Sequence, residues 1–378
     1  MHLYNDLFTP AQKKLLEETS EYTETRLAKD AKHFDETGEY PQELLEYFFQ
    51  KKVFELVSSG DRADLAAFFE IIRIVSTKFA ALASIMLTQA FYAIVPVSQF
   101  GTESQKSKLL AQLVDRQKIG AFGLTEESET SQNSTDVKTV AWETKTGWEI
   151  SGEKKYLSNA PIADVFLIVA ATRQLDGKEG QGLFIIDQGT PGLKINEPMN
   201  KMGVRSLPVA GASLNHVKVS ADSLLGQKAE GKKQVEIVMN LMKLAVAIQA
   251  LGIAQGSFTK GLDYLNLVRR IGNRLIDNQD IQYRMADLRT NIYSAEAFVR
   301  QIILTDPQNT IDVAMAKLLT ANVAVDATET IIQLTGGYGY MKDSEIERYV
   351  RDAKITAIYG GSSRSQKEII AKHWIENR

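Results

Sequence analysis

Histidine and cysteine, the residue types that most often bind metals or act as nucleophiles and bases, are scarce in this sequence. The 378 residues include no cysteine, which excludes disulfides, thiolate metal sites and cysteine nucleophiles. The histidines show no metal-ligand spacing, and no Ser–His–Asp arrangement can be assembled around them. They are His2, His33, His216 and His373. We therefore expect no metal site.

Charge and hydropathy narrow the class of protein further. The net charge of −3 gives no global basic field that would attract nucleic acid. The most apolar stretch, Ala80–Val97, is interrupted by polar residues and by Pro96, which favours a buried core helix over a membrane span. The N-terminus lacks a cationic start followed by an apolar core, so it does not read as a signal peptide. We expect a cytoplasmic protein that neither inserts in a membrane nor binds nucleic acid.

The hydrophobic pattern divides the chain into three regions. Helical spacing extends from Thr9-Pro10, a good helix start, to about Lys118. From Gly120, short apolar runs between turn residues predict a small β-domain, and Lys145-Thr146-Gly147 marks a hairpin. Helical spacing returns at about Gln227 and continues to the end. The expected fold class is α+β, with an N-terminal helical domain (1–119), a middle β-domain (120–226) and a C-terminal helical domain (227–378).

Six short blocks stand at fixed places in this α-β-α layout. They are GAFGLTE (120–126), GEKKYLSN (152–159), GTPGL (189–193), KMGVR (201–205), QLTGGYGY (333–340) and ERYVRDAKI (347–355). In this order and spacing they resemble the landmarks of the acyl-CoA dehydrogenase family over nearly the whole chain. The resemblance implies a β-barrel-like middle domain and a C-terminal four-helix bundle.

The resemblance also implies a cofactor and a reaction. Members of the family use FAD to remove hydrogen from the α and β carbons of an acyl thioester. A glutamate takes the α-proton while a hydride leaves the β carbon for the flavin. The α-proton is weakly acidic, so backbone N–H groups and a flavin hydroxyl must polarise the carbonyl and a base must lie within hydrogen-bond reach. An apolar pocket raises the pKa of that glutamate toward neutrality.

The positions expected to face the flavin are largely kept. Thr125 and Ser158 match hydroxyl residues that hydrogen-bond the flavin ring, and Tyr156 stands where the family usually has tryptophan. Ser131 matches a serine expected near phosphates of the substrate or the cofactor. Tyr359 and Ser362 are further cofactor candidates. Thr125 and Ser158 can instead be strand-end hydroxyls that satisfy turns.

The loop after Thr125 departs from the family. Relatives have a glycine-rich run, whereas this chain has residues Glu127 to Ser134 with one residue inserted. Glycines there let a backbone approach its ligand closely. Glu127 and Glu129 would repel the phosphates of CoA if they faced them. We expect weakened CoA binding.

The second half of the FAD site, which relatives complete across a subunit interface, is altered as well. Val268 stands at the position of an FAD-binding arginine, and Arg269 is the nearest substitute. Gln333, Gly336 and Gly337 match residues that approach the adenylate. The two glycines can also serve as the C-cap of a helix, and both roles can hold together.

The largest departure concerns the base. The usual glutamate position is Gly360, and the alternative position known in some relatives is Met242, followed by Lys243 where the family has arginine. Glu236 is roughly 9 Å from Met242 along a helix. Glu345 is a weaker candidate. Loss of a positioned base ordinarily removes about two to four decades of rate.

Three functions remain open on this sequence. The first is an FAD-dependent oxidoreductase acting on an acyl thioester, bound to CoA or to a carrier protein. The second is a non-catalytic subunit that braces FAD in a mixed assembly, and the third is a scaffold without flavin. The resemblance implies a homodimer or homotetramer, with a heteromer as an alternative and electron-transfer flavoprotein as a possible electron acceptor.

Overall fold

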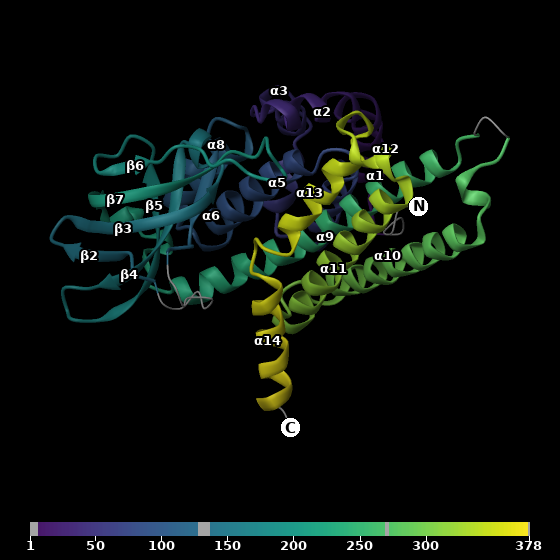
Figure 1. Cartoon of the computed structure of the whole chain (residues 1–378). Helices are drawn as coiled ribbons and strands as arrows, with labels where there is room; N and C mark the ends of the chain where they lie inside the picture. Colours follow the sequence, from purple (N-terminus) through teal and green to yellow (C-terminus); the bar gives the residue numbers. More distant parts are fainter. Residues whose placement is uncertain (1–6, 128–136, 269–271, 377–378) are drawn as a thin grey trace.

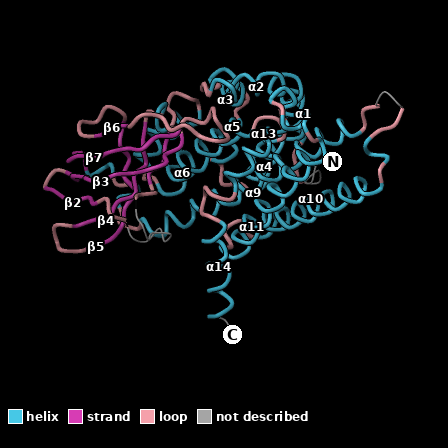
Figure 2. Tube along the Cα trace, in the orientation of Figure 1, coloured by secondary structure: helices cyan, strands magenta, loops and turns pink. Residues whose placement is uncertain are grey.

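The computed structural model describes residues 7–127, 137–268 and 272–376. A curled β-sheet occupies one end of the molecule, and helices from both ends of the chain form the rest (Figures 1 and 2). The sheet lies between the two helical regions in sequence. The expected order of helical, β and helical regions is therefore confirmed.

The N-terminal helices surround one continuous apolar helix. α1 begins at Pro10 behind a capping box, in which Thr9 Oγ1 accepts from Gln12 N and Gln12 Oε1 accepts from Thr9 N. The central helix contains a wide π-helical turn, η3, just before Pro96. A proline ring crowds the carbonyl four residues back and donates no hydrogen bond, which the wider turn accommodates. The elements are α1 (Pro10–Tyr22), η1 (Thr23–Leu27), α2 (Ala28–Thr37), α3 (Gln42–Gln50), η2 (Val53–Val57), α4 (Arg62–Ser76), α5 (Ala80–Leu87), η3 (Thr88–Ile94), α6 (Val95–Phe100), α7 (Glu103–Gln105), η4 (Lys106–Leu110) and α8 (Ala111–Val114).

The sheet has seven strands in mixed orientation. β1 and β2 pair in parallel with the first and second halves of β4, while β5 pairs antiparallel with β4. β2 and β3 form the predicted hairpin. The register of β3 against β7 shifts at two bulges, which bend and twist the sheet. The strands are β1 (Gly120–Gly123), β2 (Val140–Thr144), β3 (Gly147–Ser158), β4 (Val165–Arg173), β5 (Glu179–Asp187), β6 (Leu193–Ile195) and β7 (Val209–Ser220).

The C-terminal region is built on three long helices and closes with three shorter ones. α9 packs along α11 and against α4, and Gly256 permits the close approach to α4, because a Cβ there would overlap the carbonyl oxygen of Thr77. α14 extends away from the body (Figure 1). The helices are α9 (Gly231–Leu265), α10 (Gln279–Thr305), α11 (Thr310–Thr335), α12 (Gly337–Tyr340), α13 (Ile346–Thr356) and α14 (Ser363–Glu376).

Two helical stretches are long and apolar enough to cross a membrane by composition. They are Ala80–Phe100 and Gly231–Leu265, whose most apolar windows are 94% and 89% buried inside the protein. Their apolar side chains form the core between the N-terminal and C-terminal helices. This burial confirms the expectation that the Ala80–Val97 stretch is a core helix.

Candidate active site

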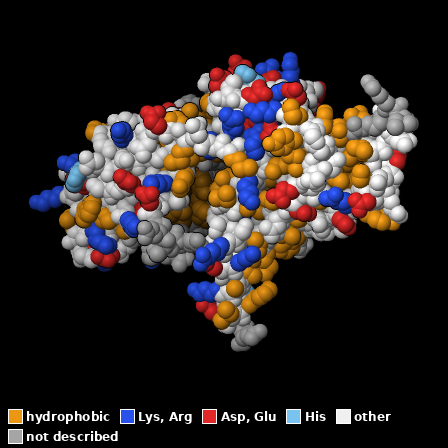
Figure 3. All heavy atoms as spheres, in the orientation of Figure 1, with side chains coloured by type: hydrophobic (Ala, Val, Ile, Leu, Met, Phe, Trp, Pro, Cys, Tyr) orange, Lys and Arg blue, Asp and Glu red, His pale blue; other side chains and the backbone are white. Residues whose placement is uncertain are grey.

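A hollow with hydrophobic side chains in its wall lies between the sheet and the helices (Figure 3). In the same view, the connection between α13 and α14 overlaps this hollow (Figure 1). That connection contains Gly360 and Gly361, whose φ angles of 66° and 97° favour glycine. Within the described residues, no acceptor takes a hydrogen bond from the N–H groups of Gly360, Gly361 or Ser362. We call this segment, residues 359–362, the glycine turn.

A neutral polar network holds the start of the glycine turn. The Tyr359 hydroxyl donates to Gln249 Oε1, and Gln249 Nε2 donates to Ala80 O and Ser84 Oγ at 2.7 Å each. Burial raises the pKa of Tyr359, so its phenol stays protonated at neutral pH. A protonated phenol that already donates to Gln249 cannot act as a base. The network therefore positions Tyr359 and leaves its cofactor role as a prediction.

A second tyrosine belongs to the π-helical turn η3. The ring of Tyr92 stacks on Phe122 of β1 with 4.8 Å between centroids, and its hydroxyl donates to the sulfur of Met239 on α9 across 3.7 Å. Burial raises the pKa of Tyr92 as well. Tyr92 thus joins the central helix, the sheet and α9 at one point, which the sequence did not indicate.

The two expected positions of the base meet at one stretch of α9, because Met242 belongs to that stretch and Gly360 lies against it. A Cβ built on Gly360 would lie 3.3 Å from Val246 Cγ2, and Met242 lies one helical turn before Val246. Met242 is buried, with 1% of its surface exposed. Glu236 is turned toward the start of α11, where Thr310 Oγ1 lies 3.5 Å from its carboxylate. Neither Gly360 nor Met242 carries a carboxylate. Glu236 does not replace one, because its carboxylate is directed to Thr310.

Two buried lysines lie behind the glycine turn. Lys317 on α11 has no exposed surface, and its Nζ donates to the carbonyl oxygen of Gly361. Lys243 on α9 donates to Asn240 Oδ1 at 3.4 Å. Burial, together with the smaller effect of the like charge of Lys243, lowers the pKa of Lys317 to about 7. The sequence did carry a signal for Lys317, because it follows buried Val313 by four residues and so lies on the buried stripe of α11.

The flavin-facing candidates of the sheet lie together at one edge. Thr125 follows β1, and its carbonyl accepts from the N–H of Lys155 on β3 at 2.8 Å. The next residue, Tyr156, sits in a bulge with φ 59° and is 65% exposed. Ser158 ends the same strand. An exposed aromatic ring between two hydroxyl residues fits one edge of an isoalloxazine ring.

A buried ion pair supports this edge from behind. Lys154 Nζ donates to Glu126 Oε1 at 2.5 Å and to the carbonyl of Leu124 at 3.3 Å. Glu126 also accepts from the N–H groups of Lys138 and Thr139. Burial lowers the pKa of Lys154 to about 8, against the opposing effect of Glu126. The pair therefore fixes the chain immediately on either side of Thr125.

The altered loop after this edge is only partly within the described residues. Glu127 pairs with Lys155 at 2.7 Å, so its charge is balanced at the surface. Ser131 and Glu129 lie outside the described residues, and so does Arg269. The predictions for these three residues stay open. Ser362 Oγ accepts from the N–H of Ser365 at 3.2 Å, which makes it a cap for α14.

The adenylate candidates lie at the opposite end of the C-terminal helices from the sheet. Gln333 is in the last turn of α11, and Gly336 forms its C-cap with φ 58°. A Cβ on Gly336 or Gly337 would meet nothing within 4 Å, so space for a ligand exists there. Val268 is 72% exposed. One chain therefore does not bring the two halves of the expected FAD site together.

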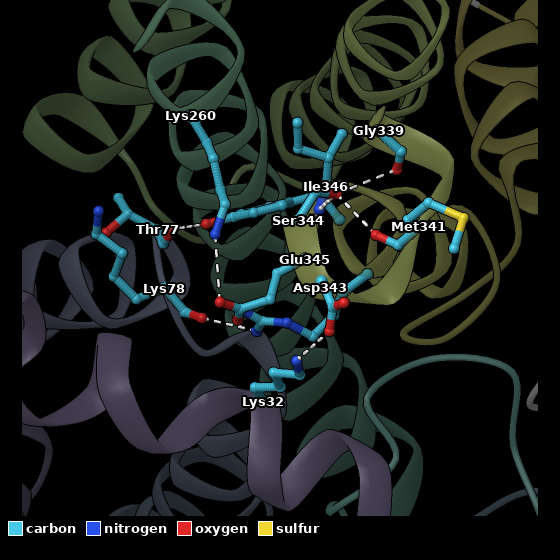
Figure 4. A network of polar contacts seen from close by, with 12 residues as sticks. Lys32, Thr77, Lys78, Lys260, Gly339, Met341, Asp343, Ser344, Glu345 and Ile346 are labelled. Carbon is cyan, nitrogen blue, oxygen red and sulfur yellow. Dashed lines mark hydrogen bonds and ion pairs between the residues drawn. The ribbon is translucent and has the colours of Figure 1, made fainter. Parts of the chain in front are cut away.

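Glu345, the remaining acidic candidate, is held in a network of its own (Figure 4). It accepts from Lys260 at 3.3 Å and from Arg348 at 2.9 Å, and Arg348 also donates to Lys78 O. These bonds tie α13 to α9 and to the end of α4. Glu345 therefore joins helices and has no free carboxylate for a reaction. No cluster of metal-ligating side chains occurs within the ranges that the structure describes.

The chain matches models of known domains along most of its length. The acyl-CoA dehydrogenase N-terminal domain matches residues 9–117, the middle domain 121–217 and the C-terminal domain 229–375. The short-chain-specific acyl-CoA dehydrogenase of Clostridium acetobutylicum is 31% identical over 370 residues, covering 96% of this chain and 97% of that protein. The corresponding protein of Megasphaera elsdenii is 30% identical over 371 residues, covering 95% and 96%. The structure of butyryl-CoA dehydrogenase from Megasphaera elsdenii superposes with a TM-score of 0.90 at 29% identity, covering 97% of this chain and 99% of that one.

Proposed function

Since the chain belongs to the acyl-CoA dehydrogenase family, we propose that it is an FAD-dependent oxidoreductase acting on an acyl thioester. The observation that carries this proposal is the sheet edge formed by Thr125, Tyr156 and Ser158. Two hydroxyl residues flank an exposed aromatic ring there, and a buried ion pair supports them. An exposed ring beside two hydroxyl residues suits contact with a flat, polar-edged ligand such as a flavin.

FAD is the cofactor of the family, and when bound it supplies the acceptor for a hydride. Thr125 and Ser158 would hold its ring, with Tyr156 against it. Gln333, Gly336 and Gly337 would hold the adenylate of the FAD bound to a neighbouring subunit. Ser131, Arg269, Tyr359 and Ser362 remain further candidates for contacts with the cofactor.

The glycine turn supports the activation of a thioester carbonyl. A backbone N–H group needs no side chain, so the change from glutamate to Gly360 leaves a hydrogen-bond donor at that position. The N–H groups of Gly360, Gly361 and Ser362 have no acceptor among the described residues. Donors without an acceptor beside an apolar wall suit a developing negative charge on oxygen. The turn thus keeps donors that could activate a carbonyl. The side-chain carboxylate for proton transfer is absent from both expected positions, Gly360 and Met242.

The family also indicates the partners of this chain, although in less detail than its cofactor. Its members are oligomers that act on acyl-CoA, and we propose a homodimer or homotetramer here, because the two halves of the FAD site lie at opposite ends of one chain. An electron-transfer flavoprotein would accept the electrons. We also propose a cytoplasmic location, which the burial of both long apolar helices supports.

An absorbance spectrum of the purified protein tests the proposal. We expect a flavin band that a panel of acyl-CoA thioesters bleaches under anaerobic conditions. A colourless protein that takes up no added FAD would contradict the proposal. A flavin band that no acyl-CoA or carrier-bound thioester bleaches would instead favour the FAD-bracing subunit, and co-purification would then be used to find a partner chain that carries a glutamate.

A further inference from the structure

The glycine turn is held from behind by one charged side chain. Lys317 on α11 reaches the turn with its Nζ, which donates to the carbonyl oxygen of Gly361. The lysine has no exposed surface, whereas the carbonyl that it contacts belongs to a half-buried glycine, so the bond is part-buried. Among the described residues, no carboxylate forms an ion pair with Lys317. Its ammonium is therefore directed to a backbone carbonyl instead of an acidic partner.

Few other restraints act within the turn, although Ser363 N donates to Ala357 O at 3.0 Å across it. Two consecutive glycines contribute no side chains that could pack, and glycine is the residue with the most backbone freedom to lose. The ends of the turn are fixed, because Tyr359 N donates to Ile355 O at 3.0 Å and Ser362 O accepts from Gln366 N at 3.0 Å. Between those ends, and within the described residues, the bond from Lys317 to Gly361 is the one hydrogen bond made by either glycine. A charge-assisted bond of this kind is roughly twice as strong as a neutral one.

Two helices that pack against α11, namely α9 and α14, carry charged groups. The charge of Lys243 on α9 lowers the pKa of Lys317. Glu236, on the same helix, raises the pKa of Lys243 against the effect of burial. On α14, Arg364 and Glu368 pair with each other at the surface. Lys243 therefore opposes the protonated state of Lys317, and burial opposes it too. The surroundings therefore disfavour the proton that makes the bond to Gly361 charge-assisted, and a neutral amine would donate a weaker bond.

We propose that Lys317 is a positioning residue whose ammonium fixes the glycine turn, and that the turn loosens when Lys317 loses its proton. The polarised peptide is the one between Gly361 and Ser362, so the same ammonium strengthens the Ser362 N–H as a donor. The link to thioester binding rests on the proposed function. The tether, by which we mean the hydrogen bond from Lys317 to Gly361, does not rest on the proposed function. It can be measured without substrate or cofactor.

Hydrogen exchange of residues 355–366, followed by mass spectrometry between pH 6 and 8 and corrected for intrinsic rates, tests the tether. The reporters are the hydrogen-bonded amides on either side of the turn, those of Tyr359, Ser363 and Gln366. At pH 6 we expect Lys317→Met to exchange about tenfold faster or more than the wild type, as for loss of a charged hydrogen bond. The wild type should approach that variant above pH 7. Lys317→Arg should stay protected throughout, because a guanidinium keeps its proton. Lys243→Met should move the wild-type transition to higher pH.

The matched control is Lys354→Met, which removes an exposed lysine of α13 close to the turn. It should follow the wild type at every pH. The proposal is overturned if Lys317→Met exchanges like Lys354→Met, or if Lys317→Arg keeps the pH dependence of the wild type. The comparison of wild type and Lys317→Arg decides the matter even if Lys317→Met fails to fold. A protected, pH-dependent turn in a protein that binds no flavin would leave the tether standing and reject only the proposed function.

Discussion

Asp352 on α13 accepts a hydrogen bond from the backbone N–H of Val204 across 2.6 Å, which joins the C-terminal helices to the segment before β7. Val204 has φ 43°, an unfavourable angle for a β-branched residue, so the surroundings must hold it there. Burial raises the pKa of Asp352 to about 6, although Arg348 and the Val204 N–H act in the opposite direction. The carboxylate thus combines a structural contact with a titration near neutrality.

Replacement of Asp352 should separate these two effects. Asp352→Asn keeps an oxygen that can accept from Val204 but has no charge, whereas Asp352→Ala leaves that buried N–H without a partner and should cost about 1–3 kcal/mol. The pKa of Asp352 is higher in the folded state, so wild-type stability should fall as pH rises from 4 to 6 relative to Asp352→Asn, by up to about 1.4 kcal/mol per unit. Urea unfolding at pH 4, 5, 6 and 7 measures both differences. Parallel pH curves for wild type and Asp352→Asn would contradict the prediction.

The Lys154–Glu126 pair should behave as a buried ion pair. Removing one partner leaves an uncompensated buried charge, so Lys154→Met or Glu126→Gln should destabilise the protein by about 3–5 kcal/mol. The double variant Lys154→Met/Glu126→Gln should lose less than the sum of the single changes. Urea unfolding of all three provides the double-mutant cycle. Additive losses would show that the two side chains do not interact.

Substitution of Gly360 should create the missing base. Gly360→Glu places a carboxylate on the glycine turn, at a cost of about 1–2 kcal/mol for its positive φ. The new Cβ would lie 3.3 Å from Val246 Cγ2, so the companion change Val246→Ala gives it room. Gly360→Gln in the same background has nearly the same size and strain but no basic group. We expect the glutamate to bleach bound flavin with acyl-CoA about two to four decades faster than the glutamine. Equal rates would mean that the loop after Thr125 prevents productive binding.

The low pKa of Lys317, the buried lysine of α11, should also make the free energy of unfolding depend on pH. The pKa of Lys317 is about 7 in the folded protein and 10.5 in its unperturbed state. Between these values the unfolded chain binds the proton and the folded chain does not, so wild-type stability should rise with pH. Relative to Lys317→Met, the wild type should gain up to about 1.4 kcal/mol per pH unit from pH 7 to 10. Urea unfolding over this range, with Lys354→Met as control, measures the slope, and a slope shared by all three proteins would refute the prediction.

Local signals predicted much of the fold. Thr9-Pro10 and Gln12 define the first helix start, and Lys145-Thr146 forms the turn between β2 and β3, because caps and turns depend on neighbouring residues alone. The positive φ angles of Tyr156 and Val204 could not be predicted in this way. Neither residue favours that conformation, so the surrounding sheet and helices impose it.

The candidate site was predictable where it depends on sequence position and obscure where it depends on packing. Gly360 and Met242 were aligned separately, and only the structure shows that Gly360 lies against Val246, one helical turn from Met242 on α9. Lys317 could have been noticed on the buried stripe of α11. Its contact with Gly361, 44 residues later, depends on how α11 packs against the end of α13, which periodicity does not give.

The π-helical turn η3 sets the rotational phase of the central helix. An ordinary α-helix advances about 100° per residue, so one extra residue in a turn changes which face all later side chains present. Tyr92 lies inside η3, and its ring reaches Phe122 and Met239 only in the present phase. Deleting a single residue between 88 and 94 would keep the composition of the helix almost intact and yet turn its second half away from the sheet. The length of this segment is therefore as tightly constrained as its residues.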